Sequence, residues 1–252
     1  MKKTALITGA TSGIGKACAE KFAANDYRVI ITGRREDRLK NLKSELEANF
    51  DAQVLPLTFD ISKRDEVDRA LSGLPAEWSN IDILVNNAGL ALGLNPIHEG
   101  DLNDWDTMID TNVKGILYMS KPVANMMIKQ GSGHIIHIGS ISGRDVYPNG
   151  NVYCATKYAI DGLTKAMRID LMQYGIKVTQ IAPGAVDTEF SEVRFKGDKE
   201  KADSVYEGYK PLTGKDVAEA VYFVTTQPPH VNIDDLLIMP VAQAGTTIFD
   251  RK

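Results

Sequence analysis

The stretch TALITGATSGIGKACAEKF, residues 4–22, decides the fold. It opens with a short apolar run of strand-forming residues, passes through a turn that contains three glycines, and continues in an amphipathic helical pattern. A helix that follows a strand can return the chain to the starting end of a parallel sheet, which a tight hairpin cannot do. The stretch therefore predicts a protein of the α/β class.

Strand and helix patterns alternate along the rest of the chain. The strand-like runs are almost continuously apolar, which is typical of parallel strands covered by helices on both faces. We therefore expect a Rossmann-like doubly wound parallel sheet of about seven strands with helices on both faces, as a single domain over residues 1–252. The expected strands are 4–8, 28–32, 53–57, 81–86, 134–139, 176–182 and 235–239, and the expected helices are 14–25, 35–49, 63–73, 101–129, 151–174 and 214–226.

The composition is that of an ordinary globular protein and excludes several functional classes. Hydrophobic residues make up 43% of the 252 residues and charged residues 25%, and the formal net charge is -4. No basic block indicates nucleic-acid binding, no run approaches the ~18 apolar residues of a membrane span, and the four histidines lack the spacing of metal ligands. Cys18 and Cys154 fall within expected helices, where we expect buried free thiols and a cytoplasmic setting.

The segment 184–213 interrupts the alternation of strands and helices. It is polar, long and weakly periodic. Connections longer than about 12–15 residues usually carry a function or are disordered. We expect a lid over a substrate here, with a mobile surface loop as the alternative, and residues 184–213 are referred to below as the lid segment.

The first glycine-rich turn has the features of a nucleotide site. Glycine permits positive φ angles and lets the backbone approach a ligand closely, and a helix that begins near Gly13 offers unpaired N–H groups to a phosphate. The spacing of Gly9, Gly13 and Gly15 differs from GxGxxG, and the turn lacks the GK[ST] ending of a P-loop. Its place between the first strand and an amphipathic helix favours a dinucleotide. The alternative is a glycine-rich turn without a ligand.

The end of the second strand indicates which dinucleotide is bound. An NAD site usually has an acidic residue there, but this strand is followed by Arg34 and Arg35. Arginine binds phosphate with paired hydrogen bonds, so the two arginines predict the 2′-phosphate of NADP. A solvated arginine pair, offset by the acidic residues that follow it, is the alternative. Asp60 lies past the third strand, where its carboxylate could meet an adenine.

Polar residues follow the later strands, at the carboxyl ends where open α/β sheets bind ligands. NNAG, residues 86–89, suits hydrogen bonds around a ribose, or alternatively a tight turn held by asparagine side chains. Ser140 follows the next strand. Pro183 and Gly184 form a rigid turn that could support a planar ring, and Thr188 can hydrogen-bond a carboxamide.

The stretch NVYCATK, residues 151–157, places Tyr153 and Lys157 on one face of a helix. A charge about 4 Å from a phenol contributes about 4 kcal/mol at an effective dielectric near ~20, or roughly three pKa units before desolvation. We therefore expect Lys157 to bring the pKa of Tyr153 close to working pH, where general acid–base catalysis is efficient. With Ser140 holding the substrate oxygen, the three residues would polarise a carbonyl beside a hydride source.

Together these motifs resemble the short-chain dehydrogenase/reductase family over essentially the whole chain. TGATSGIG resembles the cofactor turn of that family, and NNAG resembles its ribose-side motif. The resemblance implies that Ser140, Tyr153 and Lys157 are catalytic, and that Asn112 in IDTNVKG is a fourth catalytic residue whose carbonyl holds a water in a proton relay. It also implies an NADP(H) site formed by Gly9, Thr11, Ser12, Gly13, Ile14, Gly15, Arg34, Arg35, Asp60, Ile61, Asn87, Ala88, Gly89, Tyr153, Lys157, Pro183, Gly184, Val186 and Thr188.

A closer resemblance is to the NADP-dependent 3-hydroxy acid dehydrogenases of this family. The runs WDTMIDTNVKG, GNVYCATK and TEFSEVRFKGD carry it, and it implies substrates such as serine, allo-threonine and 3-hydroxypropionate. A carboxylate substrate needs a cation in its pocket. Arg194 in the lid segment is our candidate, with Ser140 and Tyr153 on the reacting oxygen, and Lys196 and Arg144 are weaker candidates.

Two other functions are open, and each predicts a different feature. A ketoreductase of the same family acting on an acyl thioester or a lipid ketone would have a large apolar pocket or a basic docking patch. An NADP-sensing module that regulates a partner would lack an intact catalytic set. We also expect association, because the helices carry apolar residues on more than one face, and the resemblance implies a homotetramer. The examples are Ile160, Leu163, Met167 and Leu171.

Overall fold

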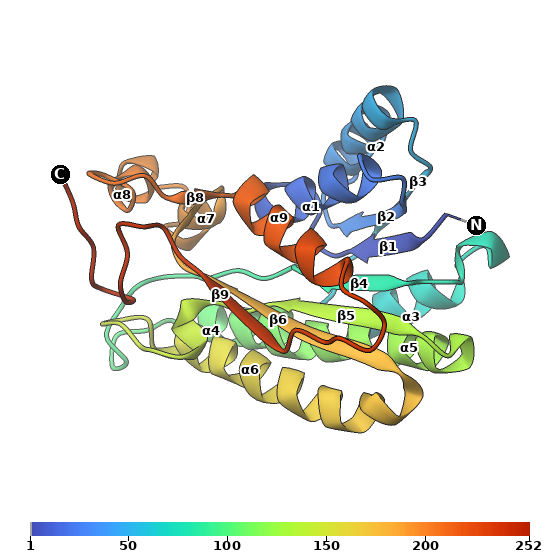
Figure 1. The fold of residues 1–252 in the computed structure, drawn as a ribbon. Coiled ribbons are helices and arrows are strands. Elements are labelled where there is room, and N and C mark those ends of the chain that lie inside the picture. The colour runs from blue at the N-terminus through green and yellow to red at the C-terminus, as the bar shows by residue number, and fades with distance from the viewer. Residues whose placement is uncertain (1) are drawn as a thin grey trace.

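A seven-stranded parallel sheet lies between two layers of helices in the computed structural model, which describes residues 2–252 (Figure 1). The strand order is β3-β2-β1-β4-β5-β6-β9, and each neighbouring pair is parallel. The predicted fold class is confirmed, and each expected strand is present to within two residues at either end. The strands are β1 (Thr4–Ile7), β2 (Arg28–Gly33), β3 (Val54–Thr58), β4 (Ile83–Asn86), β5 (Gly133–Ile138), β6 (Ile176–Pro183) and β9 (Asp235–Ile238).

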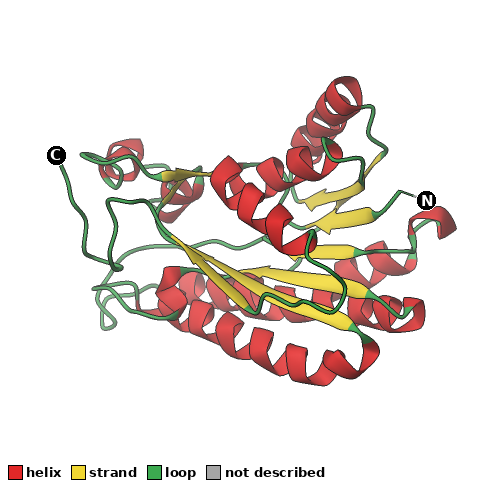
Figure 2. Cartoon of the chain, viewed as in Figure 1, coloured by secondary structure: helices red, strands yellow, loops and turns green. Residues whose placement is uncertain are grey.

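Helices cover both faces of the sheet, as Figure 2 shows with helices in red and strands in yellow. One face carries α1 (Gly13–Ala23), α2 (Glu36–Phe50) and α9 (Gly214–Thr225). The other face carries α3 (Arg64–Ser72), α4 (Leu102–Ile109), α5 (Gly115–Gln130) and α6 (Asn151–Leu171).

Alternate residues of the central strands enter two separate cores. In β1, Ile7 packs with Phe22 in the core beneath α1 and α9, whereas Leu6 packs with Met119 in the core beneath α5. All four side chains are fully buried. Burying a side chain of this size contributes about 1.5–3 kcal/mol, so a strand covered on both faces must be apolar at every position. That requirement explains the continuous apolar runs in the sequence.

The expected helix 101–129 is interrupted in the structure. A π-helical turn, Asp110–Lys114, separates α4 from α5 and contains Asn112. The side chain of Asn112 donates to the carbonyl oxygen of Leu90 at 2.8 Å and accepts from its N–H at 2.9 Å. The wider turn therefore ties the helix to the loop that follows β4. Single π turns of this kind occur frequently at functional sites.

The lid segment is more regular than its sequence suggests. It contains α7 (Phe190–Arg194) and α8 (Lys199–Ser204), and its ends pair as two short parallel strands, β7 (Val186–Asp187) and β8 (Leu212–Thr213). Helices of five and six residues are too short to produce a visible periodicity, which is why these elements were not predicted. The β7–β8 pair fastens both ends of the segment at the carboxyl end of the sheet, beside the C-terminal segment (Figure 1).

The apolar residues of α6 named above do not form a second exposed face. Ile160 and Leu171 are buried, and Met167 packs against the same core. Together with the half-buried Leu163 they lie along one stripe of the helix, so the expectation that these residues occupy more than one face was wrong. The exposed apolar side chains in this region are Ile169 and Met172, which are 68% and 70% exposed.

Both cysteines are buried free thiols, as expected, and no helix in residues 2–252 is long and apolar enough to cross a membrane. Two of the histidines, His134 and His137, are buried core residues. Within the described chain, no cluster of histidine, cysteine or acidic residues has the arrangement of a metal site.

His137 belongs to a directional chain of buried hydrogen bonds. Thr164 donates its hydroxyl to the carbonyl of Ile160 at 2.7 Å, so its oxygen must accept from Nδ1 of His137 at 2.8 Å. Nε2 of His137 is then the acceptor, and the Ser120 hydroxyl lies 3.5 Å away as its donor. Asn86 donates to the Ser120 oxygen at 2.9 Å. These bonds join β4 and β5 to α5 and α6 and require a neutral imidazole.

We therefore predict that stability falls with pH below the normal pKa of histidine. Burial lowers the pKa of His137 to about 4, so the unfolded chain binds a proton before the folded chain does. The contribution of His137 is complete above pH ~6.5 and is lost as the pH falls toward ~4, by up to about 1.4 kcal/mol per pH unit. Denaturant titrations from pH 7 to 4.5 should show a shallower decline for His137→Gln than for the wild type. An unchanged slope would contradict the prediction, and the exposed His98→Gln is the matched control.

Candidate active site

A cleft of about 580 Å³ opens at the carboxyl ends of the strands. It extends from the glycine turn to α6 and is bordered by the lid segment and the C-terminal segment. Of the residues predicted for the site, Gly15 and Asn112 lie outside its lining, as do the weaker substrate candidates Lys196 and Arg144. The predicted residues that line it are Gly9, Thr11, Ser12, Gly13, Ile14, Arg34, Arg35, Asp60, Ile61, Asn87, Ala88, Gly89, Ser140, Tyr153, Lys157, Pro183, Gly184, Val186, Thr188 and Arg194.

The glycine turn leaves the start of α1 open toward the cleft. Gly9 and Gly13 have φ angles of 65° and 53°, which favour glycine. A side-chain carbon at Gly15 would lie 2.3 Å from the carbonyl oxygen of Gly9, so this glycine is required for the turn to close. Ser12 precedes α1 without a side-chain capping bond in the described structure, so the first N–H groups of the helix remain available. An anionic group fits this position.

Thr8 at the end of β1 holds the glycine turn against the loop after β4. Its hydroxyl oxygen accepts from the N–H groups of Asn87 and Ala88, both at 3.0 Å. The Asn87 side chain donates to the carbonyls of Thr8 and Gly9 at 2.9 and 3.2 Å. Sequence reasoning missed Thr8, because only strand pairing brings it beside Asn87.

The two arginines after β2 have different surroundings. The Arg34 side chain is 64% exposed and lies 3.7 Å from Asp60. Arg35 donates to the hydroxyls of Thr11 and Ser12 at 2.8 and 3.1 Å. Guanidinium groups beside a helix N-terminus form a donor set suited to a dinucleotide that carries an additional phosphate.

Tyr153, Lys157 and Ser140 meet at the inner end of the cleft. The ammonium of Lys157 donates to the carbonyl of Ile138 at 3.0 Å and lies 5.8 Å from the centre of the Tyr153 ring. The Ser140 oxygen accepts the N–H of Ser142 at 3.0 Å, so its own hydroxyl hydrogen can be donated to a neighbouring oxygen such as that of Tyr153. Two successive turns of α6 and the end of β5 thus bring together a phenol, an ammonium and a hydroxyl.

Burial dominates the electrostatics of these groups. Burial lowers the pKa of Lys157 to about 8. Burial also raises the pKa of Tyr153 above its usual value, and this outweighs the lowering by the charge of Arg194 and the hydrogen bond with Ser140. The expectation that Lys157 would bring the Tyr153 pKa close to neutrality is therefore wrong, because burial disfavours the charged forms of both groups.

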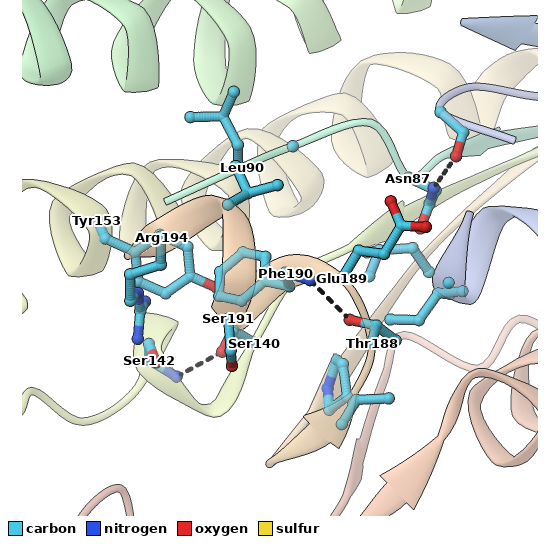
Figure 3. Close-up of a pocket in the computed structure, with 18 of the residues that line it drawn as sticks. Asn87, Leu90, Ser140, Ser142, Tyr153, Thr188, Glu189, Phe190, Ser191 and Arg194 are labelled. Atoms are coloured by element: carbon cyan, nitrogen blue, oxygen red, sulfur yellow. Dashed lines mark hydrogen bonds between the residues drawn. The ribbon is translucent and has the colours of Figure 1, made fainter. Parts of the chain in front are cut away.

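Arg194 of the lid segment packs against aromatic rings at the same end of the cleft (Figure 3). Its guanidinium lies 4.9 Å from the ring centre of Tyr153 and 5.0 Å from that of Phe190. One terminal nitrogen donates to the hydroxyl of Tyr147 at 2.7 Å, whereas Nε is buried without a hydrogen-bond partner in residues 2–252. The two weaker candidates are paired elsewhere, Lys196 with Asp104 and Arg144 with Asp235.

Asn112 does not line the cleft but is connected to it through hydrogen bonds. Its side-chain amide donates to the Thr156 hydroxyl at 3.1 Å, and that hydroxyl donates to the carbonyl oxygen of Tyr153 at 2.7 Å. The π turn is thus connected to the backbone of the tyrosine by two hydrogen bonds. The role of Asn112 in a proton relay remains a prediction.

Several residues of the cleft were not predicted. Phe190 packs against the Tyr153 ring with their centres 5.5 Å apart, and Gln243 accepts the N–H of Ala185 at 2.8 Å. Phe190 follows Thr188 closely and could have been included on that basis, but no local signal marks the C-terminal residues. The unpredicted lining residues include Leu90, Tyr147, Glu189, Phe190, Tyr206, Tyr209, Gln243, Thr246, Phe249 and Arg251.

A family model, curated relatives and a solved structure all resemble this chain over most of its length. Residues 3–199 match a family model described as short chain dehydrogenase. The chain is 49% identical over 240 residues to the NADP-dependent 3-hydroxy acid dehydrogenase YdfG of Salmonella typhi, covering 95% of each chain. It is 41% identical over 251 residues to the NADP-dependent 3-hydroxy acid dehydrogenase of Schizosaccharomyces pombe, covering 99% of this chain and 97% of that one. The closed form of serine dehydrogenase complexed with NADP+ superposes with a TM-score of 0.92 at 46% identity, covering 99% of each chain.

Proposed function

The chain belongs to the short-chain dehydrogenase family, and we propose that it is an NADP-dependent oxidoreductase that interconverts a short 3-hydroxy acid and its 3-oxo acid. The observation that carries this proposal is the position of Arg194, a half-buried cation whose guanidinium lies 4.9 Å from the ring of Tyr153. A proton-transfer group and a carboxylate-binding group thus stand side by side in one cleft. The relatives described above, which include 3-hydroxy acid and serine dehydrogenases, support the same substrate class.

The coenzyme site follows from the donors at the glycine turn. The open start of α1 suits the pyrophosphate, and the arginines after β2 suit the additional phosphate of NADP. Asn87 is oriented by Thr8 so that its free carbonyl oxygen can meet a ribose hydroxyl. Thr188 lies at the base of the lid segment, where it can bond the carboxamide. When bound, NADP supplies the acceptor or donor of the hydride.

In this proposal Tyr153 transfers the proton and Ser140 orients the reacting oxygen. The Ser140 oxygen already accepts from Ser142, so its hydroxyl can serve as the donor to the oxygen of the alcohol or ketone. During oxidation the Tyr153 oxygen takes the hydroxyl proton, and during reduction it returns a proton to the carbonyl oxygen. Lys157, with its pKa lowered to about 8 by burial, can pass that proton on. Asn112 keeps the backbone of Tyr153 in place through Thr156.

Arg194 is the proposed ligand of the substrate carboxylate. Its buried Nε lacks a partner in residues 2–252, and leaving such a donor unpaired is unfavourable unless a ligand accepts from it. A 3-hydroxy acid places its carboxylate two carbons from the hydroxyl. With its hydroxyl at Tyr153, such a substrate would place its carboxylate near Arg194, because the Arg194 guanidinium packs against the Tyr153 ring.

The lid function, the assembly and the cellular location complete the proposal. We propose that residues 184–213 close over the substrate, since Phe190 and Arg194 of that segment both contact Tyr153. Exposed apolar side chains such as Ile169 and Met172 support association, and a homotetramer is the proposed assembly. The two buried free thiols support a cytoplasmic location.

Replacing the proposed proton-transfer group should abolish most turnover. We expect Tyr153→Phe to lower kcat for serine, allo-threonine and 3-hydroxypropionate by about 10²–10⁴-fold, the usual contribution of general acid–base catalysis. NADPH binding, measured by fluorescence titration, should persist. Tyr158→Phe, an exposed tyrosine on the same helix, is the matched control. Turnover that survives in Tyr153→Phe would exclude the acid–base role.

Replacing Arg194 should affect acidic substrates selectively. We expect Arg194→Gln to lower kcat/KM for 3-hydroxypropionate relative to 1,3-propanediol by about 10- to 100-fold, because a charge-assisted hydrogen bond contributes about 1.5–3 kcal/mol. An effect of Arg194 on the Tyr153 pKa acts on both substrates and cancels in the ratio. Lys196→Gln removes a cation of the same segment that points away from the cleft. A ratio that stays constant in Arg194→Gln would show that the carboxylate binds elsewhere.

A further inference from the structure

A single carboxylate of the lid segment is held by two arginines of the coenzyme side. Both oxygens of Glu189 accept from one terminal nitrogen of Arg38, at 2.6 and 2.8 Å. A terminal nitrogen of Arg35 donates to the same carboxylate at 3.1 Å. Hydrogen bonds from Arg38 and Arg35 outweigh the effect of burial and lower the pKa of Glu189, which keeps it ionised.

These ion pairs connect segments that are far apart in the sequence. Glu189 immediately precedes α7, whereas Arg35 precedes α2 and Arg38 lies in its first turn. Next to the ion pairs, Thr188 lies against the glycine turn, because a side-chain carbon placed at Gly13 would be 3.1 Å from it. The base of the lid segment is therefore fastened across the cleft at the edge of the coenzyme site.

The ion pairs also separate the roles of the two adjacent arginines. Arg35 is occupied on both sides, by Thr11 and Ser12 through Nε and Nη2 and by Glu189 through Nη1. Arg34 makes no side-chain hydrogen bond in residues 2–252 and stands 3.7 Å from Asp60. The cation whose donors are free to take a phosphate is Arg34.

We propose that Glu189, Arg35 and Arg38 form a clasp that holds the lid segment closed over the coenzyme. Of the two arginines assigned to the 2′-phosphate in the proposed function, the clasp then leaves Arg34 to bind it. This inference rests on the proposed function, since it assumes a bound nicotinamide dinucleotide. The clasp acts on the lid segment through Glu189 and does not require the 2′-phosphate, so it should slow the release of NADPH and NADH alike. Arg34 distinguishes the two coenzymes and contributes nothing to closure.

The clasp also links the coenzyme side to the reacting groups. Phe190 follows Glu189 directly, and its ring centre lies 5.5 Å from that of Tyr153. Arg194 follows within the same short helix. Opening the Glu189 ion pairs therefore frees the base of the helix that carries the carboxylate-binding group.

The opposite arrangement, in which Glu189 competes with the 2′-phosphate for Arg35, predicts tighter NADPH binding once the glutamate is removed.

The test measures coenzyme release directly. Each enzyme is loaded with NADPH or NADH, excess NADP+ or NAD+ is added, and the loss of reduced-coenzyme fluorescence gives the release rate. For Glu189→Gln we expect release of both coenzymes to accelerate by about two- to tenfold, the effect of losing two half-exposed ion pairs. Arg38→Gln should act similarly, and the double variant should add little to either single change.

Matched variants separate the clasp from general charge effects. Glu192→Gln removes the same charge from the same helix, at a side chain that makes no ion pair in residues 2–252, and should leave both rates unchanged. Arg34→Gln should weaken NADPH binding by about tenfold or more and leave NADH binding unchanged.

Three results would overturn the inference. Slower NADPH release from Glu189→Gln would identify the glutamate as a competitor of the phosphate, and unchanged release of both coenzymes would show that the ion pairs do not hold the lid segment. Equal effects of Arg34→Gln on both coenzymes would remove its assignment. A wild-type protein that binds NADH as tightly as NADPH would instead contradict the proposed coenzyme, and the effect of Glu189→Gln on release would still test the clasp.

Discussion

The site depends on the reversal of strand order at β1. The neighbours of β1 are β2 on one side and β4 on the other, so the connections after β1 and β4 diverge and leave a crevice at their carboxyl ends. Thr8 and Asn87 hold the two sides of this crevice at a fixed separation through short hydrogen bonds. The glycine turn, the arginines after β2 and helix α6, which carries Tyr153 and Lys157, all take their positions from this arrangement.

Desolvation shapes the chemistry inside the cleft. Lys157 is buried and Tyr153 is partly buried, and burial shifts the pKa of each in the direction that favours its neutral form. The charge of Arg194 and the hydrogen bond with Ser140 act in the opposite direction on Tyr153. The pKa of Tyr153 therefore depends on the lid segment as well as on its own helix. In the proposed function, the cation that binds the substrate carboxylate also acts on the proton-transfer group.

The lid segment joins the two halves of the site. Its two ends are paired as β7 and β8. Glu189, just before α7, forms ion pairs with Arg35 and Arg38. Helix α7 itself places Arg194 over the ring of Tyr153. Ion pairs exposed to solvent are individually weak, so such a closure can open readily. This balance suits a cleft that must admit a large coenzyme and still exclude water around the reacting atoms.

The sequence by itself determined the sheet, its covering helices and the predicted coenzyme and catalytic residues, because these depend on local periodicity, glycine turns and the short spacing of Tyr153 and Lys157. Tertiary structure decided the rest. Glu189 meets Arg38 only because the lid segment folds back across the cleft. The pKa of Tyr153 rises because burial outweighs the charge of Arg194, whereas spacing alone predicted that Lys157 would lower it. Contacts between distant segments and the exclusion of water arise only when the whole chain has folded, so no local pattern in the sequence reports them.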